Sequence, residues 1–158
     1  MEIQKQDLER SNSNSRKDLI TVACLVLVDP TGAVLITQRP IEKQLGGLWE
    51  FPGGKVETRE TAEVALRREI IEELQIEIGS LQPMIPVTHH YDFGAIQLVP
   101  FLSRCEKRPP IRLIEHSDLA WVEQMDFLKY QWAPADLPVV EELRSILSGN
   151  EIKPSHPA

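Results

Sequence analysis

The sequence predicts an α/β sandwich in which helices cover a mixed β-sheet. Several segments have the apolar, β-branched character of strands. Two further segments have helical spacing, and they are interspersed with the strands, which favours a layered α/β architecture. A length of 158 residues fits one domain, and an apolar fraction of 42% is ordinary for a globular core.

The amino-terminal half begins with a predicted hairpin. Residues 1–18 are polar and predict a mobile leader. Residues 19–28 form a continuous apolar run, which is typical of a buried strand. Asp-Pro-Thr-Gly at residues 29–32 fits a type I turn, so residues 33–38 are expected to return as the hairpin partner. Residues 39–48, which include two adjacent glycines, are expected to form a loop.

A helix is predicted from about Ala62 to Leu74. Thr61 is a good N-cap residue, since its hydroxyl can accept from a backbone N–H of the first turn. The apolar positions at helical spacing should pack inward, and they are Ala62, Ala65, Leu66 and Ile70.

The carboxyl-terminal half predicts three more strands and a second helix. Residues 81–90 and 96–103 have strand character and are joined at residues 91–94. Residues 118–122 predict a short strand, and residues 137–147 predict a helix that tolerates Pro138 in its first turn. The expected organisation is therefore a domain over residues 19–148 and a polar tail over residues 149–158.

Charge and composition exclude several classes of partner. A net charge of −7, with no basic run longer than two residues, argues against a nucleic-acid polymer or an anionic membrane as partner. No signal peptide and no stretch of membrane-spanning length is visible, so we expect a cytoplasmic protein. Cys24 and Cys105 lack metal-ligand spacing and are expected to be free thiols. A nucleotide remains an acceptable substrate, and the chain is expected to be a monomer or homodimer.

The first predicted helix has an unusual concentration of acidic residues on one face. Glu69, Glu72 and Glu73 are three and four positions apart and are therefore neighbours on a helix. Like charges at this spacing cost a helix roughly 0.2–0.5 kcal/mol a pair. A hard divalent cation such as Mg²⁺ converts this repulsion into binding, because it prefers carboxylate oxygens and phosphates.

This segment resembles the Nudix box. The pattern is a glycine, a glutamate, an Arg-Glu pair and a Glu-Glu pair at fixed spacing, and the matching positions are Gly54, Glu60, Arg68, Glu69, Ile70, Glu72, Glu73 and Ile76. Gln75 stands where the pattern has its last glycine, a residue that follows the helix as a carboxyl-terminal cap. This departure affects the expected geometry of the turn after the helix, and it does not affect the carboxylates.

The resemblance implies a fold, a metal and a set of roles. Members have the Nudix fold, an α/β/α sandwich with a mixed sheet, and hydrolyse nucleoside diphosphates linked to another moiety with Mg²⁺ or Mn²⁺. The implied metal ligands are the carbonyl of Gly53 and the side chains of Glu69, Glu72 and Glu73. Arg68 is expected to orient these carboxylates, while Gly54 and Glu60 support the loop. Lys55 is either a phosphate contact or a solvated lysine.

Two matches outside the box are similar to the MutT-like branch, which sanitises nucleotide pools. Arg39 ends an Ile-Thr-Gln-Arg segment and is the candidate phosphate contact; the alternative is an ordinary surface arginine. Glu115 stands six residues before Trp121 and is the candidate for a further catalytic carboxylate, either a metal ligand or a general base. The alternative for Glu115 is a solvated loop acid.

A third match places Asp136 where this branch reads the base. The MutT pattern has asparagine there, and an ionised carboxylate only accepts hydrogen bonds. An ionised Asp136 favours a base edge with donors, such as those of guanine or cytosine, whereas a protonated Asp136 also donates. The alternative is that Asp136 caps the helix that follows.

The leading hypothesis is a nucleoside triphosphate pyrophosphohydrolase that releases a monophosphate and pyrophosphate. The expected substrate is 8-oxo-dGTP or dGTP, and the alternative is CTP or 5-methyl-dCTP. A non-catalytic Nudix-fold binding module is less consistent with a chain that keeps all three box carboxylates.

Overall fold

The computed structural model describes residues 19–149. The leader expected over residues 1–18 and all but Gly149 of the expected tail lie outside this range. Within it, helices are too short or too polar to cross a membrane. The elements of residues 19–149 are one eight-stranded sheet, two α-helices and two short 3-10 helices.

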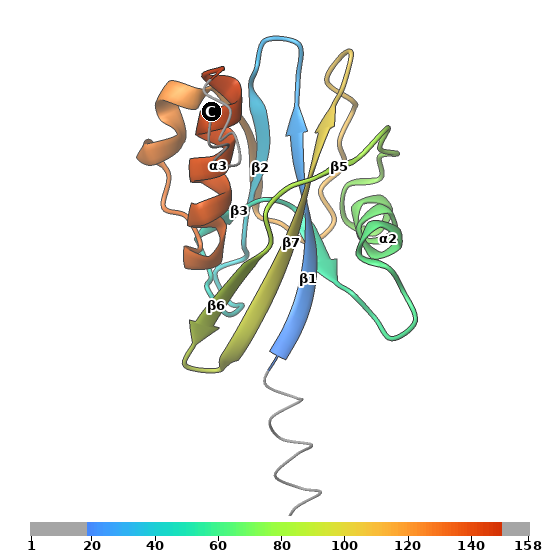
Figure 1. The fold of residues 1–158 in the computed structure, drawn as a ribbon, viewed down its shortest axis with the longest axis vertical. Coiled ribbons are helices and arrows are strands. Elements are labelled where there is room, and N and C mark those ends of the chain that lie inside the picture. Colours follow the sequence, from blue (N-terminus) through green and yellow to red (C-terminus); the bar gives the residue numbers. More distant parts are fainter. Residues whose placement is uncertain (1–18, 150–158) are drawn as a thin grey trace, which may run out of the picture.

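Strand β1 (Leu19–Val28) is the centre of the sheet, whose main path has the order β3-β2-β1-β7-β5 (Figure 1). It pairs in parallel with β7 (Gly94–Arg104) over its whole length, from Leu19 opposite Ala95 to Val28 opposite Arg104. The other strands pair antiparallel and are β2 (Val34–Gln38), β3 (Trp49–Glu50), β4 (Gly53–Lys55), β5 (Gln82–Pro83), β6 (Val87–Tyr91) and β8 (Asp118–Val122). The expected mixed sheet is therefore confirmed.

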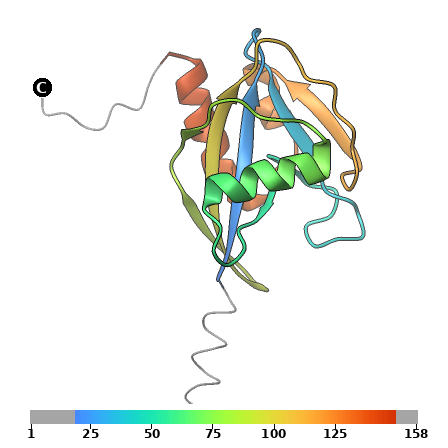
Figure 2. The same cartoon turned by 90° about the vertical axis from the view of Figure 1, so that its right-hand side faces the viewer.

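Alternation along β1 creates a core on each face of the sheet. Cys24 and Val26 belong to the core that contains α3 (Leu137–Leu147) and the 3-10 helices η1 (Gln124–Lys129) and η2 (Pro134–Asp136). Ala23 and Leu25 belong to the core beneath α2 (Ala62–Leu74). Figure 2 shows α2 crossing the sheet on the face opposite α3, which gives the α/β/α layers.

Helix α2 has the predicted bounds and the predicted cap. The Thr61 hydroxyl accepts a hydrogen bond from the Val64 N–H at 3.2 Å. One stripe of the helix is fully buried against the sheet, and it consists of Ala65, Leu66, Ile70 and Leu74. Glu69 and Glu73 lie on the same side of the helix as this stripe and are partly buried where they line the cavity described below, whereas Glu72 is exposed.

Gln75 keeps the left-handed turn that a glycine would make more easily. Its backbone has φ 57° and ψ 39°, and its N–H donates to the Ile71 carbonyl at 3.1 Å. This is the αL carboxyl-terminal cap, adopted here by a residue with a Cβ. The departure from the box pattern therefore leaves the path of the chain intact, at a cost in backbone strain.

One expectation about the strands is confirmed in part and another is corrected. The hairpin pairing of β1 with β2 is confined to Val28 and Val34, and β2 instead pairs along its length with β8. The reason is that β4 occupies the edge of β1, where Leu25 N–H also donates to the Pro52 carbonyl at 2.8 Å. The single strand expected over residues 81–90 is split into β5 and β6, since prolines interrupt the donors between them.

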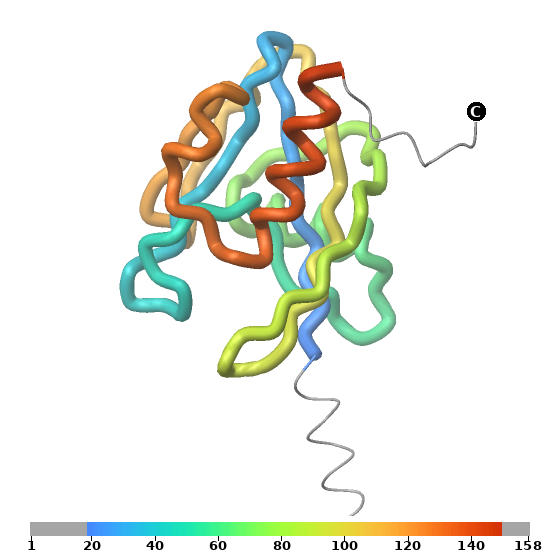
Figure 3. The backbone as a smooth tube through the Cα atoms, turned by 60° about the vertical axis from the view of Figure 1, so that its left-hand side comes forward, coloured from blue at the N-terminus to red at the C-terminus, as the bar shows by residue number. Residues whose placement is uncertain are grey.

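A connection between distant segments positions the second half of the cavity described below. Trp49 N–H donates to the Gln131 carbonyl at 2.8 Å, and Ala133 N–H donates to the Trp49 carbonyl at 2.8 Å. This bridge brings the chain before α3 against β3, as the tube in Figure 3 shows. Local patterns in the sequence do not reveal such a pairing, because the two segments are separated by about eighty residues of chain.

Replacing Gln75 with glycine should stabilise the protein by about 0.5–1 kcal/mol. Glycine relieves the left-handed strain, and part of the gain is offset by the greater freedom of glycine in the unfolded chain. The measurement is urea unfolding of the wild type and Gln75→Gly. Gln75→Ala is the matched control, because it keeps the Cβ and should stay close to the wild type. Equal stability of all three proteins would contradict the strain argument.

Candidate active site

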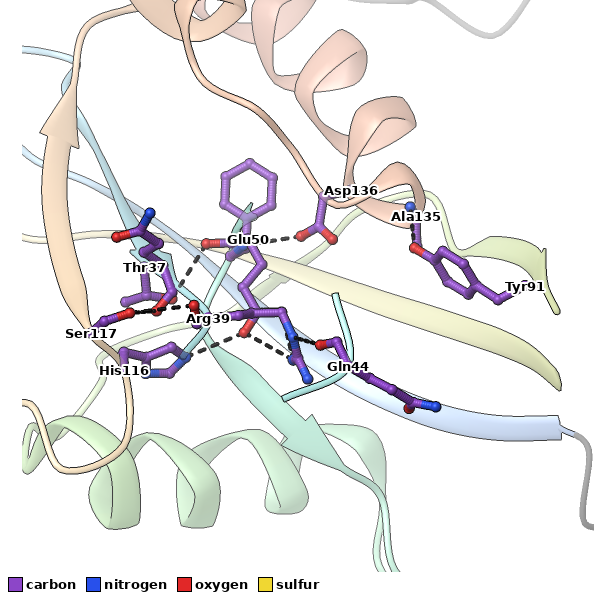
Figure 4. Close-up of polar contacts among 11 residues, drawn as sticks. Thr37, Arg39, Gln44, Glu50, Tyr91, His116, Ser117, Ala135 and Asp136 are labelled. Atoms are coloured by element: carbon purple, nitrogen blue, oxygen red, sulfur yellow. Dashed lines mark hydrogen bonds and ion pairs between the residues drawn. The ribbon is translucent and has the colours of Figure 1, made fainter. Parts of the chain in front are cut away.

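A cavity of about 430 Å³ opens between α2, the β3–β4 segment and the chain leading into α3. It is lined by candidate residues from distant parts of the sequence, namely Arg39, Gly53, Gly54, Lys55, Glu69, Glu73, Glu115 and Asp136. Figure 4 shows the polar contacts on the side of the cavity away from α2. Most of the expected site residues thus surround one space, with carboxylates at one end and Asp136 at the other.

The two glycines at the start of the box lie close to neighbouring atoms. A Cβ on Gly53 would lie 1.9 Å from the Ala23 carbonyl oxygen, where β4 pairs with β1. A Cβ on Gly54 would lie 2.2 Å from the Cδ of Glu69. Gly53 therefore cannot carry a side chain against the backbone of β1, whereas a side chain at Gly54 would displace the flexible end of Glu69 from its place on the loop.

Arg68 joins the loop to the helix. Its guanidinium binds both carboxylate oxygens of Glu60, with Nε–Oε2 at 2.8 Å and Nη2–Oε1 at 2.7 Å. It also donates to Glu69 Oε1 at 2.8 Å and to the Lys55 carbonyl at 3.1 Å. The charge-assisted bonds from Arg68 to Glu60 lower the pKa of Glu60 to about 2. The expected contact with Glu72 is also present, at 3.4 Å.

Glu73 is the most electrostatically perturbed carboxylate of the cluster. Burial raises its pKa to about 8, and the charges of Glu69 and then Glu115 add to that effect. Its Oε2 is buried and has no hydrogen-bond partner among the described residues. A buried carboxylate oxygen without a partner is costly in a native protein, so this atom is suited to a ligand that carries positive charge.

A backbone contact brings Glu115 to this cluster. Ile114 N–H donates to the Glu73 carbonyl at 3.2 Å, which docks the loop before β8 on the end of α2. The Glu115 carboxylate thereby comes close enough to raise the pKa of Glu73. Glu72 behaves differently: its side chain is 58% exposed, and it lies beside the cavity rather than in its wall.

The acidic end of the cavity fits a hard divalent cation. The available donors are carboxylate oxygens and the Gly53 carbonyl, and these are the oxygen ligands that Mg²⁺ and Mn²⁺ take. Across residues 19–149, the carboxylates do not already converge as a preformed group of three ligands. Glu69 instead accepts a hydrogen bond from Arg68. The orphaned Oε2 of Glu73 supports the fit.

The opposite wall contains an ionic network that we did not predict from the sequence. Arg39 Nη1 lies 3.1 Å from Glu50 Oε2, and His116 Nε2 lies 3.3 Å from Glu50 Oε1. The Glu50 side chain is 18% exposed. The signal in the sequence is a single acid between two aromatic residues, Trp49 and Phe51.

Asp136 does not cap the following helix, so the alternative reading of this residue is wrong. Its side chain makes no capping bond, and its Oδ1 accepts from the Phe51 N–H at 3.0 Å instead. Burial, followed by the charge of Glu50, raises the pKa of Asp136 well above its ordinary range. A protonated Asp136 can accept through one oxygen and donate through the other, much as an amide does.

The aromatic residues near Asp136 have two separate roles. Trp132 is 7% exposed and belongs to the core, where its Nε1 donates to the Phe127 carbonyl at 2.7 Å. Tyr91 and Phe93 line the cavity as a stacked pair with ring centroids 5.0 Å apart. Tyr91 Oη accepts from the Ala135 N–H at 2.8 Å and so fixes the segment that carries Asp136.

Comparisons with known proteins agree with this arrangement. The family model described as NUDIX domain matches residues 23–142. An 8-oxo-dGTP diphosphatase of Proteus vulgaris is 41% identical over 86 residues, which cover 54% of this chain and 77% of that protein. A CTP pyrophosphohydrolase of Escherichia coli K12 is 32% identical over 120 residues, which cover 76% of this chain and 88% of that protein.

The fold has equally clear counterparts among solved structures. The solution structure of the E. coli ORF135 protein superposes with a TM-score of 0.72 and 30% sequence identity. The match covers 86% of this chain and 96% of that one. With the family match, the glycine loop and the acidic helix now in place, the chain belongs to the Nudix family of hydrolases, whose members require a divalent metal ion.

Proposed function

We propose that this Nudix hydrolase is a Mg²⁺-dependent nucleoside triphosphate pyrophosphohydrolase that releases a nucleoside monophosphate and pyrophosphate. The preferred substrate is 8-oxo-dGTP or dGTP. One observation carries the proposal: a single cavity has a carboxylate cluster at its α2 end and the buried Asp136 at its α3 end. A nucleoside triphosphate can place its phosphates at the carboxylate cluster and its base at Asp136.

The acidic end of the cavity would hold the metal. The ligands in this proposal are the Gly53 carbonyl and the side chains of Glu69, Glu72, Glu73 and Glu115. When bound, Mg²⁺ or Mn²⁺ neutralises charge on the phosphate oxygens and makes a coordinated water more acidic. The placement of Glu72 beside the cavity means that its part requires a change of rotamer, whereas Glu69 and Glu73 already line the wall.

The protein groups around the phosphates have distinct tasks. Arg68 keeps Glu69 and the glycine loop in a fixed relation through its bonds to Glu60, Glu69 and the Lys55 carbonyl. Glu69 or Glu115 accepts the proton of the attacking water, since both carboxylates belong to the cluster around Glu73. Arg39 and Lys55 contact the phosphates, because both cations line the same cavity.

Asp136 would read the base. Its Oδ1 is committed to the Phe51 N–H, and the burial that raises its pKa favours the protonated form, in which the other oxygen can donate. Such a group donates to an acceptor such as guanine O6 or cytosine N3. Both candidate bases therefore fit Asp136, and the stacked pair of Tyr91 and Phe93 offers an apolar wall beside it.

CTP or 5-methyl-dCTP is the second candidate substrate. The observation in its favour is that the match to the E. coli CTP pyrophosphohydrolase extends over 76% of this chain. The third reading, a binding module without catalysis, is disfavoured because Glu69, Glu72 and Glu73 are all present beside Arg68.

The test of the proposal is a parallel turnover assay with 8-oxo-dGTP, dGTP, CTP and 5-methyl-dCTP in the presence of Mg²⁺. We expect pyrophosphate and a monophosphate as products, with 8-oxo-dGTP or dGTP showing the highest kcat/KM. A higher kcat/KM for the cytidine nucleotides would establish the second candidate. Turnover of none of the four, or full activity in excess EDTA, would refute the pyrophosphohydrolase assignment.

Glu73→Gln should lower turnover by at least about a hundredfold while leaving a folded protein. The substitution removes a charge that the cavity uses to hold metal and phosphate. Glu63→Gln makes the same chemical change on the same helix, at a side chain outside the cavity that pairs with Arg67. It should retain wild-type turnover. Comparable losses in both variants would indicate a general effect of helix charge.

Glu73→Gln should also remove a pH dependence of stability. The folded-state pKa of Glu73 is about 8, above its ordinary value of 4.5, so the folded protein binds a proton that the unfolded chain has lost. Stability of the metal-free protein therefore falls as pH rises from about 4.5 to 8, by about 1–2 kcal/mol after solvent screening. Glu73→Gln should lack this fall. Thermal unfolding at several pH values measures it, and a parallel decline in wild type and variant would contradict the assignment.

Millimolar Mg²⁺ should raise the melting temperature more at pH 8 than at pH 6, because metal and proton compete for Glu73. The comparison uses the wild-type protein with and without the metal at both pH values. An equal shift at the two pH values would argue that the metal binds elsewhere.

Substitutions of Asp136 should separate its donor and acceptor roles. Asp136→Asn keeps an acceptor for Phe51 N–H and a donor toward the cavity, so the ranking of the four triphosphates should persist. Asp136→Ala removes both, and it should raise KM and flatten the ranking. Asp126→Ala, at a partly exposed residue that lies outside the cavity and pairs with Lys129, is the control. A ranking inverted by Asp136→Asn would show that Asp136 binds the base in its ionised form.

A further inference from the structure

His116 occupies a buried position next to the candidate carboxylate Glu115. Its side chain is 6% exposed and lines the cavity, and its Nε2 lies 3.3 Å from Glu50 Oε1. An ionised carboxylate paired with an arginine only accepts hydrogen bonds. Nε2 must therefore carry the hydrogen, and this contact assigns the tautomer of the ring.

The other ring nitrogen strengthens this reading. Nδ1 of His116 is buried and has no hydrogen-bond partner among residues 19–149. Buried polar atoms are normally paired, so an apolar residue would fill this site at lower cost if packing were the only requirement. A histidine thus occupies this site although one of its nitrogen atoms is unpaired among the described residues. The hydrogen bond that its Nε2 donates to Glu50 is the property that an apolar residue could not supply.

The backbone around His116 is attached to the strand that ends at Arg39. Ser117 N–H donates to the Gln38 carbonyl at 3.1 Å, and Ser117 Oγ lies 3.3 Å from the carbonyl oxygens of both Gln38 and Arg39. Figure 4 shows His116, Glu50 and Arg39 in one connected network. The imidazole and the guanidinium therefore approach Glu50 from a common, rigid base.

Among residues 19–149, the contacts of Arg39 leave one of its guanidinium nitrogen atoms without a partner. Its Nε donates to the Gln44 carbonyl at 2.7 Å, and its Nη1 contacts Glu50 at 3.1 and 3.4 Å. Within the described residues, Nη2 has no such partner. A carboxylate that is free to turn binds an arginine in a fork, through two of its three guanidinium nitrogen atoms. Because Nε donates to Gln44, such a fork would engage Nη2 together with Nη1.

We propose that His116 is a positioning residue that keeps one face of Arg39 free for the substrate. Its Nε2–H holds Glu50 Oε1, so the carboxylate stays on Nη1 of Arg39 and leaves Nη2 available to a phosphate oxygen. This inference rests on the proposed function, in which Arg39 contacts the triphosphate. It assigns to His116 and Glu50 a part in binding the phosphates, without any contact of His116 with the reacting atoms.

The test compares two substitutions of His116 by steady-state kinetics with the preferred triphosphate. His116→Leu keeps an apolar body without a donor, and it should raise KM about tenfold with kcat changed by less than about twofold. His116→Gln places an amide donor near the position of Nε2 and should restore most of the wild-type KM. Equal KM values for the two variants, or a loss confined to kcat, would overturn the proposal.

A double-mutant cycle tests whether His116 acts through Glu50. In a Glu50→Gln background, His116→Leu should cause no further rise in KM, because the carboxylate that it positions is gone. Independent, multiplicative losses would overturn the proposed coupling. His90→Leu, at an exposed histidine of β6 outside the cavity, is the matched control and should leave KM unchanged.

Nitrogen-15 NMR of the imidazoles gives a readout that does not depend on turnover. His116 should show a hydrogen on Nε2 in the wild type, and Glu50→Gln should shift that signal. An Nδ1–H tautomer in the wild type would overturn the proposal.

A wild-type protein that turns over none of the four triphosphates would refute the proposed function and this inference with it. Wild-type turnover combined with an unchanged KM in His116→Leu would refute the inference alone.

Discussion

The guanidinium of Arg68 is the interaction on which the rest of the site depends. It binds Glu60 in a fork, donates to Glu69 and reaches the Lys55 carbonyl, so it connects the glycine loop, the start of α2 and the acidic face of that helix. One positive charge thereby offsets several negative ones and holds them in a defined arrangement. Without it, repulsion among carboxylates three and four residues apart would oppose the helical register that brings them together.

The cavity brings together several carboxylates whose negative charges are not fully offset by positive side chains of residues 19–149. Glu73 is partly buried among Glu69, Glu115, Glu50 and Glu72, and its raised pKa records the free-energy cost of ionising it there. The buried Oε2 of Glu73, which has no hydrogen-bond partner among the described residues, is a geometric sign of the same cost. This imbalance is the kind that functional sites retain, because a metal ion and a phosphate together turn the repulsion into binding.

The two ends of the cavity are assembled in physically different ways. The acidic end comes from one helix and the loop before it, and Glu115 is added by the bond from Ile114 N–H to the Glu73 carbonyl. The opposite end depends on pairing between β3 and the chain before α3. That pairing places Asp136 on Phe51 N–H, while Glu50, beside Phe51, meets Arg39 and His116. Charge on Glu50 influences both ends, since it contributes to the raised pKa of Glu73 and of Asp136.

The sequence by itself determined the parts of this protein that depend on local spacing. The bounds of α2, its Thr61 cap, the turn at Gly32 and the shared face of the box carboxylates all follow from residues within a few positions of one another. Tertiary structure alone decided which strand lies beside β2, because the insertion of β4 along β1 is a choice among distant partners. It also decided that Asp136 binds Phe51 N–H rather than capping α3, and that Glu50 meets His116. The physical reason is that strand register, burial and the partner of a buried polar group depend on contacts between segments far apart in the chain, which no local pattern specifies.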